Sequence, residues 1–386
     1  MDEAANADRR TFLEFFAGIG LVRLGLEAHG WSPLYANDIA EDKRAMYADH
    51  FGEADAASHF HLGDVHEIDA TTVPTATLAT ASFPCTDLSL AGGRKGLQGS
   101  ESSAFFGFAR VLEEMGDRRP PLVMMENVLG LINSKAGADF EAALRILNEL
   151  GYVVDAVVLD ARWFTPQSRP RLFIVGVQRP VPDDAEGEYP PALMASSRLR
   201  PDALHRFIMK HPDIRWNLRR LPSPPSHCEG TLSDIVEELP SDAPEWWSRE
   251  RSEYLYSQMS DTHRATADAW IDKPHWTYGT IFRRVRKQPD GVKRTMAELR
   301  SDGLAGCLRT PKGGSGRQIL FRAGFGRYDV RLVTPRECAR LMGADDFTIN
   351  AGTTKALFGF GDAVCVPAVA WMAEHYLNPV LDELDK

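Results

Sequence analysis

The sequence TFLEFFAGIG, residues 11–20, decides how the first part of the chain is expected to fold. Residues 11–16 are almost all apolar and predict a buried strand, and Gly18 and Gly20 allow a tight turn after it. The apolar residues that follow predict a helix that ends at Gly30. A strand, a glycine turn and a helix in this order are typical of the first unit of a nucleotide-type α/β fold.

Two acidic residues follow the next two predicted strands. Residues 33–38 predict a strand that ends at Asp38, about twenty residues after the glycines, where a carboxylate can accept hydrogen bonds from both ribose hydroxyls. Asp38 could equally be the N-cap of a helix over residues 39–51. Asp64 lies at the end of a third predicted strand, where an ordinary turn residue is equally consistent with the pattern.

The loop SFPCTDLS, residues 82–89, is where we expect the chemistry. Pro84 lacks a backbone donor and has a fixed φ, so it holds Cys85 on a stiffened turn. A cysteine is a nucleophile only as the thiolate, and Arg94 or Lys95 could lower its pKa. Without further support, a lone cysteine after an apolar strand is more often an inert core residue.

Two further segments carry candidate site residues. Residues 121–125 form a continuous apolar run, as in a parallel strand covered on both faces, and Glu126 stands at its carboxyl end, where ligands of α/β sheets bind. Arg169 and Arg171 lie between two predicted strands, residues 152–159 and 172–177, and could alternatively form surface ion pairs. Helices are predicted over residues 103–115 and 138–150.

Composition describes a soluble protein of 386 residues with 44% hydrophobic and 25% charged residues, long enough for an α/β domain and a second lobe. The five cysteines form no C-x-x-C pair, so we expect no metal site, no disulfide framework and a reducing cytoplasm. The first residues do not resemble a signal peptide, and we expect no membrane span.

Charge and composition suggest a second domain. The net charge is −10, yet basic residues concentrate in residues 198–220, 273–300 and 309–331, which could form a basic groove or simply solvated faces. Residues 179–330 are rich in Pro, Arg and Trp with little periodicity, so we expect a smaller, irregular domain there, between a catalytic domain at 1–178 and a return segment at 331–386. In that segment Thr334 and Glu337 predict a capping box, and a final helix is expected over about 363–377.

The blocks FFAGIG, Pro84-Cys85, Glu126-Asn127-Val128 and QSRPR resemble, in this order, the motifs of the prokaryotic cytosine-C5 DNA methyltransferases. The resemblance implies a Rossmann-like sheet that uses S-adenosylmethionine, a target-recognition domain, and methyl transfer to a cytosine flipped out of double-stranded DNA. It also implies a monomer that acts in restriction-modification or phage defence, and it leaves other defence-system proteins open as partners.

The resemblance also assigns roles to residues. Cys85 would attack cytosine C6, Glu126 would neutralise charge at N3, and Arg169 and Arg171 would bond the base O2 and phosphate. The cofactor residues would be Phe16 on adenine, Gly18 and Gly20 near the methionine group, Asp38 on ribose and Asp64 on the adenine amine, with Pro84, Asp362, Ala363 and Val364 closing the pocket. Thr86, Leu21, Asp362 and Cys307 depart from the residues usual in the family.

Three other functions stay open at this point. An RNA (tRNA) cytosine-5 methyltransferase of the same fold is expected to have a shorter second domain than the roughly 150 residues that follow Val177 here. A non-catalytic DNA-binding subunit would have no chemical use for Cys85, Glu126 and Arg169 together. A dehydrogenase is disfavoured because the chain lacks the G-x-G-x-x-G spacing.

Overall fold

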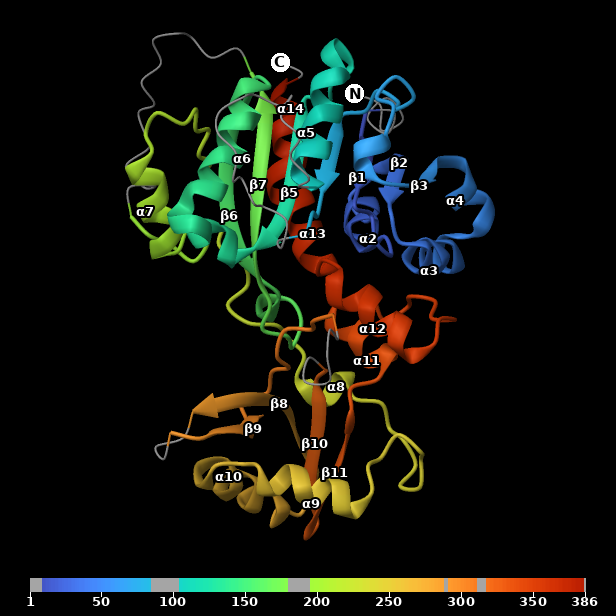
Figure 1. Ribbon diagram of the computed structural model, residues 1–386, viewed down its shortest axis with the longest axis vertical. Coiled ribbons are helices and arrows are strands. Elements are labelled where there is room, and N and C mark those ends of the chain that lie inside the picture. Colours follow the sequence, from blue (N-terminus) through green and yellow to red (C-terminus); the bar gives the residue numbers. More distant parts are fainter. Residues whose placement is uncertain (1–8, 85–103, 180–194, 288–290, 311–316, 385–386) are drawn as a thin grey trace. The chain divides into compact units, whose positions relative to one another are not determined.

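The computed structural model describes residues 9–84, 104–179, 195–287, 291–310 and 317–384 (Figure 1). The chain folds into two compact units. The first unit contains residues 1–160, 170–224 and 368–386, and the second contains residues 161–169 and 225–367.

The first unit is built on a seven-stranded sheet with the order β3-β2-β1-β4-β5-β7-β6. Strands β1 to β5 run parallel, whereas β7 is antiparallel to both of its neighbours. The strands are β1 (Thr11–Phe15), β2 (Ser32–Asp38), β3 (Phe60–Leu62), β4 (Leu78–Ala81), β5 (Leu122–Val128), β6 (Tyr152–Asp160) and β7 (Pro170–Gln178). This Rossmann-like α/β sheet confirms the predicted fold class.

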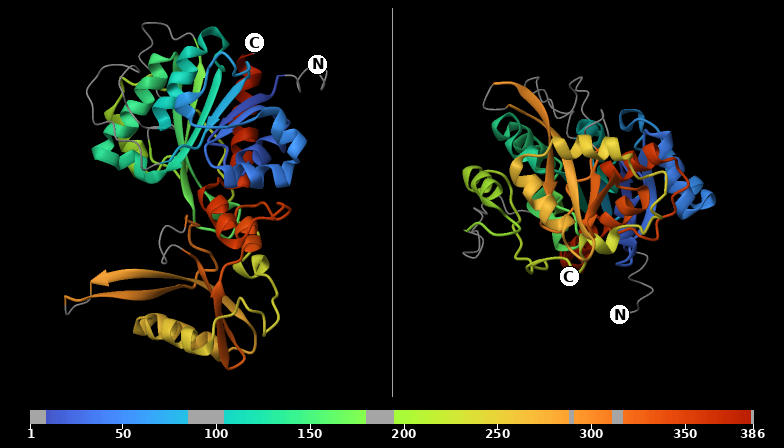
Figure 2. Two further views of the ribbon diagram at one scale, coloured as in Figure 1. Left: turned by 45° about the vertical axis from the view of Figure 1, so that its right-hand side comes forward. Right: turned by 90° about the horizontal axis from the view of Figure 1, so that it is seen from below.

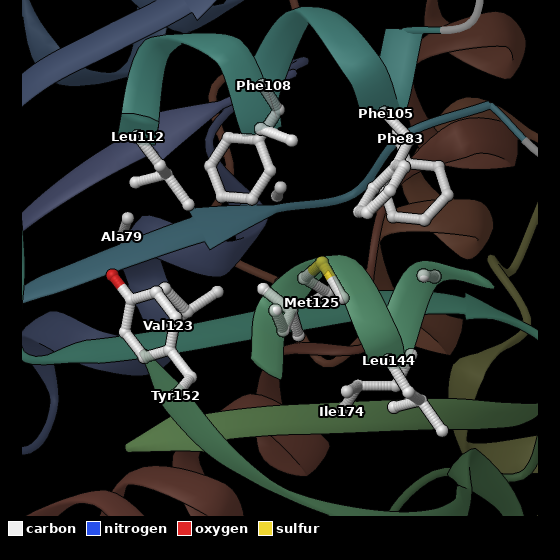
Figure 3. Close-up of a cluster of buried hydrophobic side chains, with 14 of the residues drawn as sticks. Ala79, Phe83, Phe105, Phe108, Leu112, Val123, Met125, Leu144, Tyr152 and Ile174 are labelled. Carbon is white, nitrogen blue, oxygen red and sulfur yellow. The ribbon is translucent and has the colours of Figure 1, made fainter. Parts of the chain in front are cut away.

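Helices cover both faces of this sheet. In the first unit they are α2 (Leu21–Glu27), α3 (Glu41–Phe51), α4 (Glu53–His59), α5 (Ala104–Glu114), α6 (Ala138–Glu149), α7 (Asp202–Lys210) and α14 (Asn378–Leu384); α13 (Val366–Met372) crosses the unit boundary. Figure 1 shows α5 and α6 on one face and the C-terminal helices on the other. Phe105, Phe108 and Leu112 of α5 pack on Val123 and Met125 of β5 (Figure 3), which explains why the part of β5 before Glu126 is apolar.

The second unit contains a four-stranded antiparallel sheet with the order β11-β10-β8-β9. Its strands are β8 (Thr277–Lys287), β9 (Lys293–Arg300), β10 (Ile319–Gly324) and β11 (Arg327–Leu332). Its helices are α8 (Leu232–Ile235), α9 (Arg249–Ser257), α10 (Asp261–Ile271), α11 (Pro335–Leu341) and α12 (Thr353–Asp362). This smaller domain therefore has more regular structure than its sequence suggested: Ile281, Ala297 and Leu299 bury one face of the sheet against α9 and α10.

The unit boundaries differ from the expected domain boundaries in three places, the first being that residues 161–169 belong to the second unit. Residues 195–224 join the first unit because Arg200 forms a buried ion pair with Asp155 of β6, at 2.7 Å, and the Arg219 backbone N–H donates to the same carboxylate. The return segment is divided between the two units after Pro367. Helix α12 precedes the final helices, which begin at Val366 and end at Leu384, beyond the predicted end at about residue 377.

The segment Thr353–Leu384 is long and apolar enough, by length and composition, to cross a membrane. However, 67% of its most apolar window is buried inside the structure. Tyr376, Leu377 and Val380 in this segment are fully buried, which identifies these helices as core helices.

Candidate active site

The loop from β1 to α2 makes the first part of the site. Phe16, Gly18 and Gly20 all have positive φ, at 58°, 59° and 84°. A Cβ atom at Gly20 would lie 2.5 Å from Cε2 of Phe51 and 2.8 Å from Cδ2 of Tyr47, so this position admits only glycine. The sequence pattern of strand, glycine turn and helix therefore corresponds to a real tight loop at the carboxyl end of β1.

Asp38, at the end of β2, is tied to this loop. Its Oδ2 accepts a hydrogen bond from the Gly18 backbone N–H at 2.9 Å, and its Oδ1 accepts one from Ala40 N–H at 2.8 Å. Helix α3 begins at Glu41 with Ala40 as its N-cap, so Asp38 is not the N-cap that the alternative interpretation required. Each carboxylate oxygen has a second lone pair, and Asp38 can therefore accept further hydrogen bonds from a bound hydroxyl group.

Asp64 has a local structural role. Its Oδ1 accepts a hydrogen bond from His66 N–H at 3.0 Å and caps the 3-10 turn Val65–Glu67. Asn37 holds the chain just before it, since its side-chain amide donates to the carbonyls of His61 and Gly63. The ends of β2 and β3 are thus linked, but the expected contact of Asp64 with adenine stays a prediction.

Asn127, the residue directly after Glu126, holds the segment that leads to the predicted nucleophile, Cys85. Phe83 is buried and packs against Phe105 with tilted rings, 5.4 Å between their centroids. The Asn127 side-chain amide donates to the Phe83 carbonyl at 3.1 Å, while its Oδ1 accepts from Val128 N–H at 2.9 Å. Pro84 follows directly and is exposed, and Cys85 lies outside the described residues.

Asn127 had no role in the sequence analysis, although it stands inside one of the quoted motifs. Asn127 lies on β5, and its side chain bonds the segment just after β4. This contact is visible only once β4 and β5 are known to be parallel neighbours in the sheet. Its signal in the sequence is an amide directly after the candidate acid, at the carboxyl end of an apolar strand.

Glu126 and Arg171 meet across two adjacent strands. β5 and β7 are antiparallel, and Arg171 stands opposite Val128, two residues from Glu126. Arg171 Nε lies 2.9 Å from Glu126 Oε1, and both side chains are largely buried, with exposures of 14% and 10%. A carboxylate held by a guanidinium at the edge of a sheet is oriented to accept or donate a hydrogen bond with defined geometry.

Arg169 lies in the second unit, together with Asp362, Ala363 and Val364. Its guanidinium donates to the carbonyls of Leu308, Gly361 and Ala363 at 2.8, 3.2 and 2.6 Å, and its exposure is only 2%. Its bonds join the segment around Leu308 to the end of α12. The predicted contact of Arg169 with a base or phosphate remains a prediction, and the bonds seen fix the backbone around Ala363.

The neighbouring Gln167 is also buried in the second unit. Its side-chain amide donates to the Leu341 carbonyl at 2.8 Å, and its Oε1 accepts from Leu308 N–H at 3.0 Å. Of the predicted cofactor residues nearby, Asp362 is exposed at the end of α12, whereas Val364 is buried. Among the described residues, no group of three or more His, Cys, Asp or Glu side chains could hold a metal ion.

The chain resembles known proteins over most of its length. A model of the family described as C-5 cytosine-specific DNA methylase matches residues 10–378. The chain is 25% identical over 369 residues to the type II methyltransferase M.DsaV of Dactylococcopsis salina, an alignment that covers 95% of this chain and 86% of the relative. It is 26% identical to the type II methyltransferase M.HpaII of Haemophilus parainfluenzae, with 94% and 87% covered.

Solved structures show the same fold. The crystal structure of the S. pombe Dnmt2 methyltransferase superimposes with a TM-score of 0.58 and covers 98% of this chain and 100% of that chain. The two sequences are 17% identical, so this likeness concerns the fold.

Proposed function

This chain belongs to the C-5 cytosine-specific DNA methylase family, and we propose that it methylates C5 of a cytosine flipped out of duplex DNA, through a covalent bond between Cys85 and C6. The protein is a DNA (cytosine-5-)-methyltransferase. The observation that best supports the mechanism is the hydrogen bond from Asn127 to the Phe83 carbonyl. This bond connects Phe83, two residues before Cys85, to Asn127, the residue directly after Glu126.

S-adenosylmethionine is the methyl donor that the family implies, and it supplies an electrophilic methyl group when it is bound. The first unit fits such a ligand. The backbone at Gly20 is packed too closely for a side chain. The Asp38 carboxylate lies next to the same loop, where its Oδ2 accepts a hydrogen bond from Gly18 N–H. We assign Phe16 to the adenine ring, Asp38 to the ribose and Asp64 to the adenine amine, and we keep Pro84, Asp362, Ala363 and Val364 as the further donor-binding residues that the family resemblance implies.

The proposed reaction begins at the Cys85 thiolate. Its sulfur forms a bond to C6, and the electron pair of the C5–C6 double bond then makes C5 a nucleophile that takes the methyl group. Loss of the C5 proton to a base returns an electron pair that re-forms the double bond, and the C6–S bond breaks to release the thiolate. The cysteine is thereby regenerated.

Glu126 and Arg171 act on the other side of the ring in this proposal. A proton from the Glu126 carboxyl group passes to N3 as the thiolate adds, which neutralises the charge that builds on the ring, and N3 returns this proton to the Glu126 carboxylate when the C6–S bond breaks. Arg171 Nε, 2.9 Å from Glu126 Oε1, keeps the carboxyl group oriented. Arg171 and Arg169 are also assigned to the base O2 and nearby phosphate, where a positive charge stabilises the same transition state.

The biological setting follows from the relatives. Those reported above are type II methyltransferases, which favours a role in restriction-modification, and phage defence is the wider setting. We expect a cytoplasmic monomer that acts on double-stranded DNA, with the second unit selecting the sequence.

The nucleophile is tested by replacing Cys85. The Cys85→Ala variant should transfer no methyl group from radiolabelled S-adenosylmethionine to DNA, yet should bind that donor as the wild type does in calorimetry. Cys228→Ala is the matched control, because Cys228 lies in the second unit and burial raises its pKa, and it should keep full activity. Methyl transfer by Cys85→Ala would overturn the mechanism.

A further inference from the structure

Arg23 is a buried, charged residue in the first turn of α2, directly after the loop between β1 and α2. Only 7% of it is exposed, and it takes no part in the reaction proposed above. Arginine is almost never fully buried unless its charge is paired, because an unpaired charge in the protein interior is costly. The bonds that compensate for the burial of Arg23 identify what its side chain holds together.

The guanidinium of Arg23 joins three helices. Within α2, its Nε donates to Glu27 Oε1 at 2.7 Å. Its Nη1 donates to the hydroxyl of Tyr47 on α3 at 2.9 Å and to Oδ2 of Asp55 on α4 at 2.5 Å. Figure 2 shows these helices, in blue, together on one side of the first unit. Arg23 therefore connects the helix that follows β1 to the two helices that follow β2.

The hydroxyl of Tyr47 extends this link to His59. A guanidinium can only donate, so the Tyr47 oxygen accepts from Arg23, and its own hydrogen is directed to His59 Nε2 at 2.9 Å. Nε2 can accept this bond only in neutral histidine, and burial lowers the pKa of His59, which favours the neutral form. The hydroxyl of the fully buried Tyr47 is thus bonded on both sides, which fixes the position of its ring.

The rings of Tyr47 and Phe51 form the surface on which Gly20 lies. The guanidinium carbon of Arg23 is 5.4 Å from the Tyr47 ring centroid and 3.8 Å from that of Phe51, a distance at which a cation is attracted to a ring. Both rings lie within 2.8 Å of the place where a Cβ atom on Gly20 would be. Arg23 therefore holds the two side chains that contact the end of the loop.

The Asp38 carboxylate depends on the same helices. It accepts one hydrogen bond from Gly18 N–H in the loop before α2, and one from the N–H of Ala40, the N-cap of α3. The spacing between the loop and this carboxylate thus follows from the placement of α2 relative to α3. Arg23 bonds both helices.

The structure assigns Arg23 the role of a positioning residue for the donor site, because its guanidinium fixes α2 against α3 and so sets the spacing between the loop and Asp38. This inference rests on the proposed function. Arg23 touches neither the donor nor the DNA in this role. Without its bonds the loop and the carboxylate are less well ordered, and part of the binding free energy of S-adenosylmethionine is used to order them. Donor binding then weakens while the chemical step in the complex is unchanged.

Two variants test this role, and two matched variants control for lost stability. Arg23→Gln removes the guanidinium, and Tyr47→Phe is milder, since it removes one hydroxyl and keeps the ring. The controls are Arg200→Gln and Tyr376→Phe. Both wild-type residues are buried and donate to Asp155 of β6, at 2.7 and 3.1 Å. They lose the same kinds of bond in the same unit, on a strand that three others separate from β1.

Calorimetry measures the binding of S-adenosylmethionine without DNA, and steady-state methyl transfer gives kcat and the KM for each substrate. Arg23→Gln should bind the donor about tenfold more weakly and Tyr47→Phe about threefold, with the donor KM raised in the same proportion. The kcat and the KM for DNA should stay near the wild-type values. Both controls should bind the donor as the wild type does. Arg23→Gln/Tyr47→Phe should bind it as Arg23→Gln does, because the Tyr47 hydroxyl acts together with Arg23.

Three results would overturn the inference. They are a donor affinity in Arg23→Gln equal to that of the wild type, an equal loss of affinity in Arg200→Gln, or a lowered kcat with an unchanged donor KM, as a merely less stable protein would show. If Arg23→Gln does not fold, Tyr47→Phe decides alone, and wild-type donor affinity in that variant would overturn the inference.

The proposed function is judged separately. A wild type that methylates DNA, while Arg23→Gln and Tyr47→Phe keep its donor affinity, would contradict the role of Arg23 alone. A wild type that binds S-adenosylmethionine in an Arg23-dependent manner but transfers no methyl group to DNA would contradict the proposed function alone.

Discussion

Replacing Gly20 by alanine should damage the loop between β1 and α2 through two separate costs. Gly20 has φ of +84°, and a non-glycine residue in the left-handed region costs about 1–2 kcal/mol. The new Cβ would also lie 2.5 Å from Phe51 and 2.8 Å from Tyr47, and inserting a methyl group into packed surroundings costs about 1–3 kcal/mol. The rings cannot move aside easily, because Tyr47 is fully buried and the Arg23 guanidinium lies 3.8 Å from the Phe51 ring centroid.

The expected loss in the free energy of unfolding is therefore about 2–5 kcal/mol for Gly20→Ala. Two other glycines test the conformational cost without the steric one. Gly151 has φ of +91° with no atom within 4 Å of a Cβ, and Gly18 has φ of +59° with its nearest atoms at 4.0 Å. Alanine at either position should lose only the conformational part, about 1–2 kcal/mol.

Urea unfolding measures these stabilities, and a calorimetric titration with S-adenosylmethionine measures binding. Gly20→Ala and Gly18→Ala should both weaken binding, because both alter the loop, whereas Gly151→Ala should bind as the wild type does. If Gly20→Ala were no less stable than Gly151→Ala, the claim that this loop is closed against Phe51 and Tyr47 would be refuted.

Three further changes test other parts of the site. Glu126→Gln should slow methyl transfer by about 10²–10⁴ without changing donor binding, and a normal single-turnover rate would exclude Glu126 as the acid. Asn127→Ala leaves the Phe83 carbonyl without its side-chain donor, which should cost about 1–3 kcal/mol of stability and lower the transfer rate; a normal rate would show that the tether is dispensable. Burial raises the pKa of Glu14 from 4.5 to about 8, so the folded protein retains this proton where the unfolded chain releases it, and stability should fall as pH rises between these values. Glu14→Gln should flatten this decline in urea unfolding, and parallel pH profiles for the two proteins would contradict it.

Local sequence patterns predicted those parts of the structure that depend on neighbouring residues. The capping box is present, since Thr334 Oγ1 accepts from Glu337 N–H at 3.2 Å and Glu337 accepts from Thr334 N–H at 2.8 Å. The apolar run before Glu126 is a central strand, and the glycine turn at Gly18 and Gly20 has the left-handed conformation that its composition suggested. Each of these features is determined within a few residues.

The sheet of the second unit could not be found in the same way. Only the inner half of β9 alternates, between buried and half-buried residues around Ala297 and Leu299, whereas Gly279, Thr280 and Ile281 of β8 are buried in succession. The outer halves are charged on both faces, so the period of two that identifies a half-buried strand is absent there. Pairing with β10 and packing on α9 and α10 establish the sheet, and neither is visible in a short window of sequence.

The sequence supplied candidates for the site residues, but it did not supply their partners. Asn127 meets Phe83 across 44 residues, and Arg169 meets Ala363 across 194. Such contacts depend on strand order and on how distant segments fold back, which a single sequence does not reveal. The sequence therefore suggested Arg169 as a ligand of DNA, and the structure adds its bonds to three backbone carbonyls.

The covalent bond between Cys85 and cytosine C6 is the central claim, and 5-fluorocytosine tests it most directly. Fluorine at C5 cannot leave as a proton does, so the methylated intermediate should stay attached to the protein. When the wild type is incubated with such DNA and S-adenosylmethionine, denaturing mass spectrometry should show a protein–DNA adduct whose peptide map places the link on Cys85, and Cys228→Ala should form it equally well. An adduct-free wild type under conditions in which normal DNA is methylated, or a link on any other residue, would contradict the account.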